Sequence, residues 1–250
     1  MKKSLWLTGF ICLSLVFGTC AVIIGNADTL LSEKALPVST ESKKAPLIVI
    51  DPGHGGEDGG CVGVDGVLEK ELNLLQSQSL CEILCAMGVP AEMTRTDDTM
   101  LYGMYRDMKD YGGMKKVFDL RNRLRFAEES GAAALISIHM NKFTDEKYSG
   151  AQVYYSTNSD GSTRLAALIQ ESITGNLQKE NDRLTKKAGS NIYILNRAHL
   201  TAVLCECGFL SNPQESELLQ NEDYRKKLSL CIAAAALEWI RTVDNESAAK

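Results

Sequence analysis

Residues 47–56 read Leu-Ile-Val-Ile-Asp-Pro-Gly-His-Gly-Gly and combine a strand pattern with a reactive side chain. The four apolar residues 47–50 are stopped by Asp51-Pro52-Gly53, which predicts a short buried strand followed by a turn. The glycines on both sides of His54 allow a sharp turn and the close approach of a bulky substrate. A phosphate loop is not expected, because Asp58 stands where a dinucleotide-binding loop needs its third glycine.

Outward from this strand, the chain alternates between helix and strand patterns. Apolar side chains recur at helical spacing in four segments, residues 69–87, 117–129, 163–179 and 215–242. Short apolar runs predict further strands at residues 89–94, 134–138, 150–155, 192–195 and 202–205, and residues 97–116 are expected to form a long loop. Such alternation is typical of an α/β fold, here a single domain with a mainly parallel central sheet flanked by helices. In such sheets the functional site lies at the carboxyl ends of the strands.

The N-terminal segment predicts export. Lys2 and Lys3 precede an uncharged run, residues 4–27, which is long enough to span a bilayer and ends in small residues like those of a cleavage site. We interpret residues 1–27 as a signal peptide or an uncleaved membrane anchor, with the body of the chain on the exported side. The remaining parts are expected to be a linker at residues 28–45, the folded domain at 46–242 and a tail at 243–250.

The composition is that of an ordinary globular protein. Apolar residues make up 44% of the chain and charged residues 24%, which excludes a wholly disordered chain, a collagen and a multi-span membrane protein. The net charge of -5 becomes -7 when the two lysines of residues 1–27 are removed. A domain this acidic lacks the basic surface that neutralises phosphates, so no nucleic-acid partner is expected.

The eight cysteines do not form a metal-binding pattern. Cys12 and Cys20 lie in the N-terminal segment, and the other six are Cys61, Cys81, Cys85, Cys205, Cys207 and Cys231. A thiolate zinc site is not expected, because no Cys-x-x-Cys pair occurs. Most of these cysteines are expected to be small buried hydrophobic residues, and disulfide pairing is left open.

Polar side chains with the chemistry of a metal site gather at the predicted strand ends. His54, His139 and Glu206 each come at or just beyond the end of a strand, and Glu69 opens the first long helix. Two imidazoles and a carboxylate that leave one position open are the ligands of a catalytic zinc. We therefore expect His54, Glu69 and His139 to bind Zn²⁺ and Glu206 to transfer protons. Glu71 competes with Glu69 for the ligand role, and each side chain taken alone could be an ordinary structural group.

Five segments, in order along the chain, resemble the motifs of a known family. They are Ile48–Gly56, Leu68–Leu74, Thr94-Arg95, Ile136–Asn141 and Glu206–Pro213. Together they resemble the zinc-dependent N-acetylmuramoyl-L-alanine amidases of the Amidase_3 family, over residues 46–241. The resemblance implies an Amidase_3-like α/β fold. It also implies hydrolysis of the amide between the lactyl group of N-acetylmuramic acid and L-alanine in peptidoglycan.

The resemblance also implies roles for individual residues. It implies one zinc ion per chain with three ligands, His54, Glu69 and His139. It implies three substrate contacts, Arg123, Asn141 and Arg183. The catalytic glutamate of the family matches Glu206, and the ligand motif favours Glu69 over Glu71. The chain departs from the family pattern at Glu128 and Thr201, which are not expected to take part in the chemistry.

Two segments, residues 98–116 and Tyr148–Gln152, are similar to the germination-specific branch of the family. In that branch the amidase strips peptides from muramic acid in spore cortex, so that muramic-δ-lactam can form. The implied partners are peptidoglycan and, if residues 1–27 stay uncleaved, the membrane; the implied location is the cell envelope or the cortex. The need for an accessory protein activator is left open. The alternatives are an envelope zinc peptidase that cuts within the stem peptide and a catalytically silent wall-binding regulator.

Overall fold

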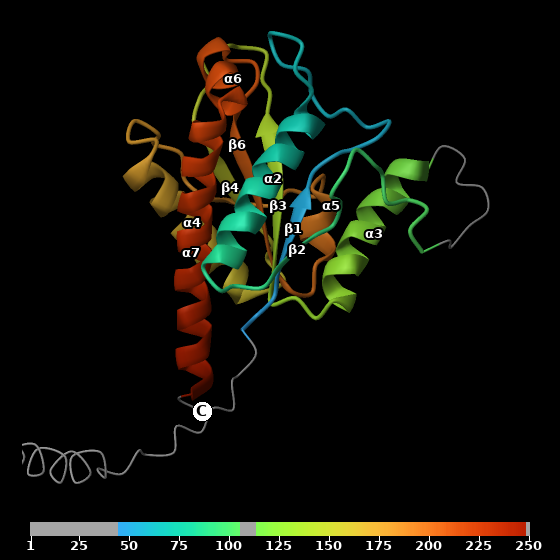
Figure 1. Cartoon of the computed structure of the whole chain (residues 1–250), viewed down its shortest axis with the longest axis vertical. Helices are drawn as coiled ribbons and strands as arrows, with labels where there is room; N and C mark the ends of the chain where they lie inside the picture. The colour runs from blue at the N-terminus through green and yellow to red at the C-terminus, as the bar shows by residue number, and fades with distance from the viewer. Residues whose placement is uncertain (1–44, 106–113, 249–250) are drawn as a thin grey trace, which may run out of the picture. The chain divides into compact units, whose positions relative to one another are not determined.

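A computed structural model describes residues 45–105 and 114–248, with side chains described up to residue 243 (Figure 1). The predicted signal peptide or anchor and almost all of the predicted linker lie outside the described residues. Within the two described stretches, no helix combines the length and the apolar character needed to cross a membrane. Residues 45–250 form one compact unit by themselves, in agreement with the predicted single domain.

A six-stranded sheet forms the centre of this domain, in the order β2-β1-β3-β6-β4-β5. Its strands are β1 (Ile48–Pro52), β2 (Ala91–Met93), β3 (Ala134–Asn141), β4 (Gln152–Tyr155), β5 (Lys186–Lys187) and β6 (Thr201–Phe209). All neighbouring strands run parallel except β4 and β6, which are antiparallel. The prediction of a mainly parallel sheet is therefore confirmed, and the carboxyl ends of β1, β3 and β6 meet at one edge.

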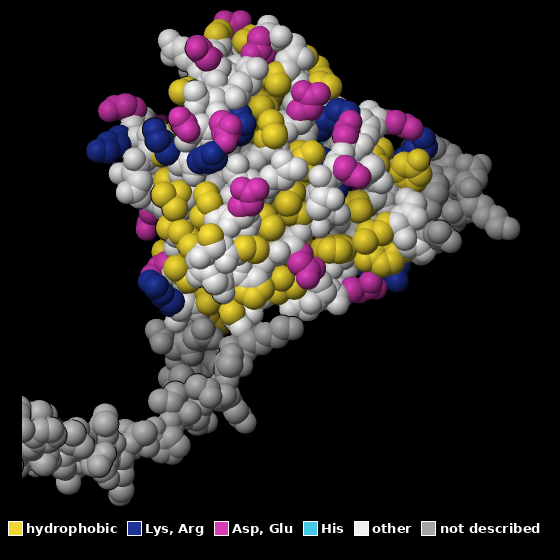
Figure 2. Space-filling model, viewed as in Figure 1, with side chains coloured by type: hydrophobic (Ala, Val, Ile, Leu, Met, Phe, Trp, Pro, Cys, Tyr) yellow, Lys and Arg dark blue, Asp and Glu magenta, His cyan; other side chains and the backbone are white. Residues whose placement is uncertain are grey.

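Helices cover both faces of the sheet. One face packs against α2 (Glu69–Ala86), α4 (Asp160–Asn176) and α7 (Glu222–Ala248), and the other against α3 (Lys115–Glu129) and α5 (Tyr193–Arg197). Strand β1 shows why its sequence is apolar throughout: Ile48 and Ile50 belong to the first core and Val49 to the second, and all three are fully buried. On the face covered by α2 and α7, acidic and basic side chains are interspersed among apolar ones (Figure 2).

The prediction of a strand at residues 192–195 is wrong, because Ile192 is the N-cap of α5 and the other three residues form the start of that helix. Ile194, Leu195 and Ala198 are buried in the second core while Asn196 and Arg197 are exposed, and burial at i, i+1 and i+4 is helical spacing. A run of four apolar residues is too short for its periodicity to distinguish the two structures.

The predicted single helix at residues 215–242 is also corrected. It is two helices, α6 (Pro213–Gln220) and α7, separated by Asn221 in an extended conformation. The side chain of Asn212 accepts a hydrogen bond from the Glu215 amide, and that of Asn221 accepts one from the Tyr224 amide, so each helix begins at an asparagine cap. Helix α7 continues to Ala248, through most of the segment that was predicted to be a tail.

The six described cysteines are free thiols. Cys205 and Cys207 on β6 belong to the core under α2, α4 and α7, whereas Glu206 between them points to the opposite face. Strands β3 and β6 run farther than predicted, so His139 and Glu206 lie within the last residues of these strands.

Candidate active site

The turn after β1 is held in place by two arginines from distant parts of the chain. His54 has a φ angle of 62°, a backbone conformation that costs a non-glycine residue free energy and needs support from its surroundings. Arg123 of α3 donates hydrogen bonds to the carbonyl oxygens of Pro52 and His54, and Arg95 donates to those of Pro52 and Gly53. The two guanidinium groups thereby fix the direction in which the His54 side chain leaves the turn.

Arg123 is itself the centre of a buried ion cluster. Its side chain is 1% exposed and pairs with Asp51 at 2.9 Å and Asp119 at 2.7 Å, both of which are buried. Asp51 also accepts hydrogen bonds from Thr94 and Ser137. Burial alone would raise the pKa of Asp51, but the Arg123 charge and the hydrogen bonds from Thr94, Ser137 and Arg123 hold it below its usual value.

The Arg123→Met variant is expected to lose about 3–5 kcal/mol of unfolding free energy, because Asp51 and Asp119 would remain buried without their counter-charge. Urea unfolding followed by circular dichroism measures this loss. Arg121→Met is the matched control, since Arg121 lies exposed on the same helix. Equal stability of the two variants would contradict a structural role for Arg123.

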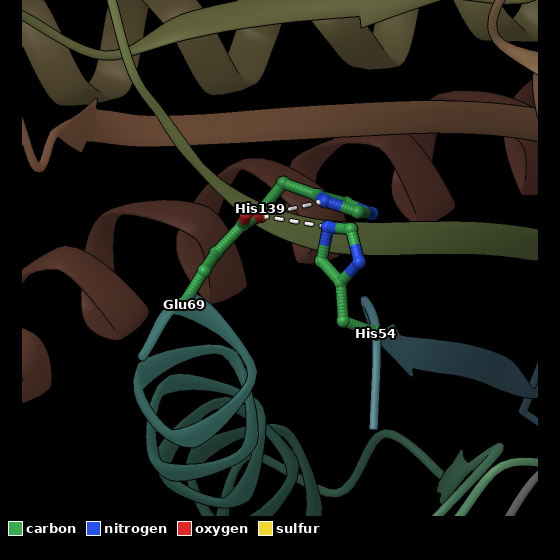
Figure 3. Close-up of side chains that lie close together, drawn as sticks. All are labelled: His54, Glu69 and His139. Carbon is green, nitrogen blue, oxygen red and sulfur yellow. Dashed lines mark hydrogen bonds and ion pairs between the residues drawn. The ribbon is translucent and has the colours of Figure 1, made fainter. Parts of the chain in front are cut away.

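His54, Glu69 and His139 point toward one another, as Figure 3 shows. Their possible ligand atoms all lie within 4.8 Å of one another. An oxygen of Glu69, Oε1, lies 3.2 Å from His54 Nε2 and 2.9 Å from His139 Nδ1. The three side chains come from three elements: the turn after β1, the first turn of α2, and the end of β3.

The Glu69 carboxylate is fixed by the surrounding backbone. Its oxygens accept hydrogen bonds from the amides of Cys61 at 2.8 Å and Met140 at 3.2 Å. Burial would raise the pKa of Glu69, but the hydrogen bonds and charges of the two imidazoles hold it well below its usual range. Glu71, the competing carboxylate, is exposed on α2, so the structure brings only Glu69 to the histidines.

Two glycines, Gly53 and Gly60, make room for this cluster because they have no side chain. A Cβ at Gly53 would lie 2.2 Å from the His139 ring, and a Cβ at Gly60 would lie 2.5 Å from Glu69 Oε2. The donor set of two imidazole nitrogens and one carboxylate, open toward a cavity, fits a zinc ion of the catalytic type, which binds three protein ligands.

Sequence reasoning missed Asp58 as a partner of this cluster. Asp58 Oδ2 lies 2.9 Å from His54 Nδ1 and 3.0 Å from Lys116 Nζ. Its carboxylate therefore contacts the imidazole nitrogen opposite to the one that faces Glu69, the arrangement by which metal-binding histidines are oriented. The only signal in the sequence is the spacing of four residues between His54 and Asp58 within a glycine-rich turn.

Glu206 lies across from His139, because the two residues are paired in the register of β3 and β6. Its Oε2 atom is buried and has no hydrogen-bond partner among the described residues. Burial raises the pKa of Glu206 to about 7, and the Glu69 carboxylate adds to the shift while the imidazoles of His139 and His54 oppose it. A carboxyl group with a pKa near neutrality can both accept and release a proton.

A cavity of about 220 Å³ joins these groups. Its lining includes the polar groups His54, His139 and Glu206 and the apolar side chains of Leu120, Ile194 and Leu204. A water molecule occupies about 30 Å³, so a water and part of a substrate fit here together. The arrangement can therefore hold a reacting bond between the candidate metal ligands and the unpartnered carboxylate.

The three predicted substrate contacts lie at different places around the site. Arg123 lines the cavity, but all of its guanidinium nitrogens donate hydrogen bonds within the protein. Asn141 ends β3, two residues beyond His139. Arg183 lies in the loop before β5, and its guanidinium group packs over the Phe209 ring. Substrate contact stays a prediction for all three.

The fold and the cluster together define a class of protein. A mainly parallel α/β sheet brings a His-Glu-His cluster, a buried carboxyl group without a hydrogen-bond partner among the described residues and a cavity to the carboxyl ends of its strands, as in metal-dependent hydrolases. Residues 48–238 match the family model Amidase_3, described as N-acetylmuramoyl-L-alanine amidase. The chain belongs to this family of enzymes, which act on the peptidoglycan of the cell wall.

Individual relatives agree with this assignment. The chain is 34% identical to the germination-specific N-acetylmuramoyl-L-alanine amidase of Bacillus subtilis over 241 residues, which cover 95% of each protein. Among solved structures, it is similar to the CwlD amidase from Clostridioides difficile in complex with the GerS lipoprotein, with a TM-score of 0.72 and 34% identity. That match covers 79% of this chain and 99% of the other. The amidase AmiC2 of Nostoc punctiforme matches with a TM-score of 0.66 and 29% identity, over 78% of this chain and 97% of the other.

Proposed function

We propose that this amidase uses one zinc ion, held by His54, Glu69 and His139, to cut the bond between the lactyl group of N-acetylmuramic acid and L-alanine. The observation that carries the proposal is the convergence of these three donors beside the unpartnered Oε2 of Glu206. Zinc supplies a Lewis acid that polarises the scissile carbonyl and lowers the pKa of the attacking water.

The side chains of the site then have separate tasks. Glu206 accepts the proton of the attacking water and delivers it to the departing nitrogen of L-alanine. Asp58 lies in ion-pair contact with His54 Nδ1, and its charge keeps Nε2 directed toward Glu69. Arg123 and Arg95 keep the turn that carries His54 in its strained conformation.

The Asp58→Ala variant is expected to bind zinc about 10- to 100-fold more weakly, because His54 loses the partner that orients its ring. Competition against a chromogenic chelator measures the affinity. The control is Glu57→Ala, which removes the neighbouring carboxylate, one that is exposed and pairs only with Lys115 among the described residues. Unchanged zinc affinity in Asp58→Ala would exclude the orienting role.

Digestion of purified peptidoglycan tests the reaction. Residues 28–250 with zinc are expected to release intact stem peptides that begin with L-alanine and to leave peptide-free muramic acid, both identified by mass spectrometry. Cuts inside the stem peptide would instead support the alternative of an envelope zinc peptidase. The absence of both product and bound zinc would favour the alternative of a catalytically silent regulator, whereas bound zinc without product would indicate a missing activator or a narrower substrate.

The same proposal extends to spore cortex. The similarity to a germination-specific amidase over 95% of both chains supports a role in preparing muramic acid for conversion to muramic-δ-lactam. Expression in a spore-forming host that lacks its own germination-specific amidase should restore the lactam to cortex muropeptides, whereas the Glu206→Gln variant should not. Wild-type expression without lactam would restrict the enzyme to other wall material.

An accessory protein also belongs to the proposal. The C. difficile neighbour was solved in complex with a lipoprotein, which supports a partner of the same kind for this chain, exported by residues 1–27 to the cell envelope. Release of stem peptides should rise when a lipoprotein of that class is added. An equal rate with and without it would remove the activator from the account.

A further inference from the structure

Arg183 is held beside the active site with its terminal nitrogens available. Its Nε donates a hydrogen bond to the Ser149 carbonyl at 2.7 Å, and its guanidinium carbon lies 4.6 Å from the centre of the Phe209 ring and 5.9 Å from that of Tyr148. Tyr148 in turn stacks on Phe209 at 6.3 Å. The two Nη atoms have no hydrogen-bond partner in the described part of the chain. The group is thus fixed in orientation by one bond and two rings and can still bind a ligand through its outer edge.

The loop that carries Arg183 lies one strand away from Glu206. Gln152 of β4 is paired with Glu206 of β6, and the Gln152 side chain donates a hydrogen bond to the carbonyl of Leu184, the residue after Arg183. Neighbouring strands lie about 4.8 Å apart, which places this loop at the rim of the catalytic centre. The charges of Glu206 and Arg183 both affect the pKa of the Tyr154 phenol, which Glu206 raises and Arg183 lowers. A substrate whose scissile bond lies at Glu206 would reach Arg183 with its next residues.

Arg183 differs from three lysines near the site, each of which already has a partner. Lys116 pairs with Asp58, Lys142 donates a hydrogen bond to the Val62 carbonyl, and Lys147 pairs with Asp145. Glu215 is the carboxylate whose pKa the Arg183 charge lowers. It already accepts hydrogen bonds from the backbone amides of Phe209 and Gly150. Since residues 28–250 carry a net charge of -7, an anionic part of a substrate needs a local cation to approach this surface.

The chemistry of the substrate decides which part of it Arg183 fits. In intact peptidoglycan the lactyl carboxyl is in amide linkage with L-alanine, so the sugars are uncharged and the anionic groups lie on the stem peptide. The planar guanidinium forms paired hydrogen bonds with a carboxylate, a geometry that an ammonium group cannot reproduce. We propose that Arg183, supported by Phe209, Tyr148 and the Ser149 carbonyl, is the subsite that binds a free carboxylate of the stem peptide beyond L-alanine. This inference rests on the proposed amidase reaction and adds a determinant of peptide specificity to it.

The test compares two soluble glycan–peptide substrates, one with free stem-peptide carboxylates and one with these groups converted to primary amides. Using the full-length protein with zinc, Arg183→Gln is expected to lower kcat/KM for the free acid about 10- to 100-fold, mainly through KM. The wild type should lose a similar factor on the amidated substrate. Arg183→Gln should turn over the two substrates at equal rates. The guanidinium and the substrate carboxylate interact only with each other, so once the guanidinium is removed, amidation of the carboxylate has no further effect.

Two further variants keep the test sharp. Arg183→Lys should restore part of the preference for the free acid, because it keeps the charge without the planar geometry. Arg241→Gln, which removes an exposed arginine of α7, is the control and should behave as the wild type. A drop of the same size on both substrates in Arg183→Gln would overturn the carboxylate subsite and leave Arg183 a role in holding the loop. Failure of the wild type to release stem peptides from either substrate would instead refute the proposed function itself.

Discussion

The Glu206→Gln variant is expected to release stem peptides about 10²- to 10⁴-fold more slowly than the wild type while it still binds zinc. Glu206 lies next to the cluster on β6, and its buried Oε2 has no partner among the described residues, so it is the group placed to move a proton. Glutamine has the same shape but cannot accept the proton. The rate is measured by mass spectrometry of released peptide, and the zinc content by elemental analysis of the same sample.

The matched control for this change is Glu217→Gln, which makes the same substitution at an exposed position of α6. It should keep the wild-type rate and zinc content. A Glu206→Gln protein that turns over at the wild-type rate would show that another group transfers the proton. Loss of zinc together with activity would show that Glu206 holds the metal.

The Glu69→Gln variant is expected to lose both zinc and activity. The Glu69 carboxylate lies within 3.2 Å of both imidazoles and accepts hydrogen bonds from two backbone N–H groups. The glutamine side chain would put an uncharged group at this position, where a metal ligand needs a negative charge. We expect zinc affinity to fall by more than about 100-fold, beyond the range for a residue that only orients a ligand. Chelator competition measures the affinity, and peptide release measures the activity.

Helix α2 supplies the control for this prediction. Glu71 lies two residues farther along and is exposed, so Glu71→Gln should keep zinc and activity. This pair of variants decides between the two carboxylates that the sequence pattern alone left open. A Glu71→Gln protein without zinc, beside a Glu69→Gln protein that keeps it, would reverse the assignment.

The apolar runs and the polar residues behind them were sufficient to predict most of the sheet and the candidate site. Strand β1 is apolar because both of its faces are covered, and this pattern is visible in residues 47–50. His54, Glu69 and His139 could be found because the carboxyl ends of parallel strands and the helix after β1 meet at one edge. Residues 192–195 were misassigned because a run of four apolar residues fits a buried strand as well as a helix, and packing against α3 and the sheet decides between them.

Contacts between distant segments could not be predicted in the same way. The hydrogen bonds from Arg123 to the turn after β1 join residues about 70 positions apart. Nothing in the local sequence of α3 indicates these bonds. The substrate contact that the resemblance implies for Arg123 stays a prediction, and the structure adds that its guanidinium is bonded to Asp51, Asp119 and the turn. Asp58 was missed for a different reason: it is only four residues from His54, but their contact depends on the direction in which the His54 ring leaves a strained turn.

Hydrolysis of peptidoglycan in water enriched in ¹⁸O tests the central claim most directly, because the oxygen of the attacking water marks the acyl side of the broken bond. If His54, Glu69, His139 and Glu206 act as proposed, mass spectrometry will find one ¹⁸O in the lactyl carboxylate of peptide-free muramic acid. The released stem peptides, which begin with L-alanine, will carry no label from this step. Label in a carboxylate of the stem peptide, with the lactyl amide intact, would contradict the account.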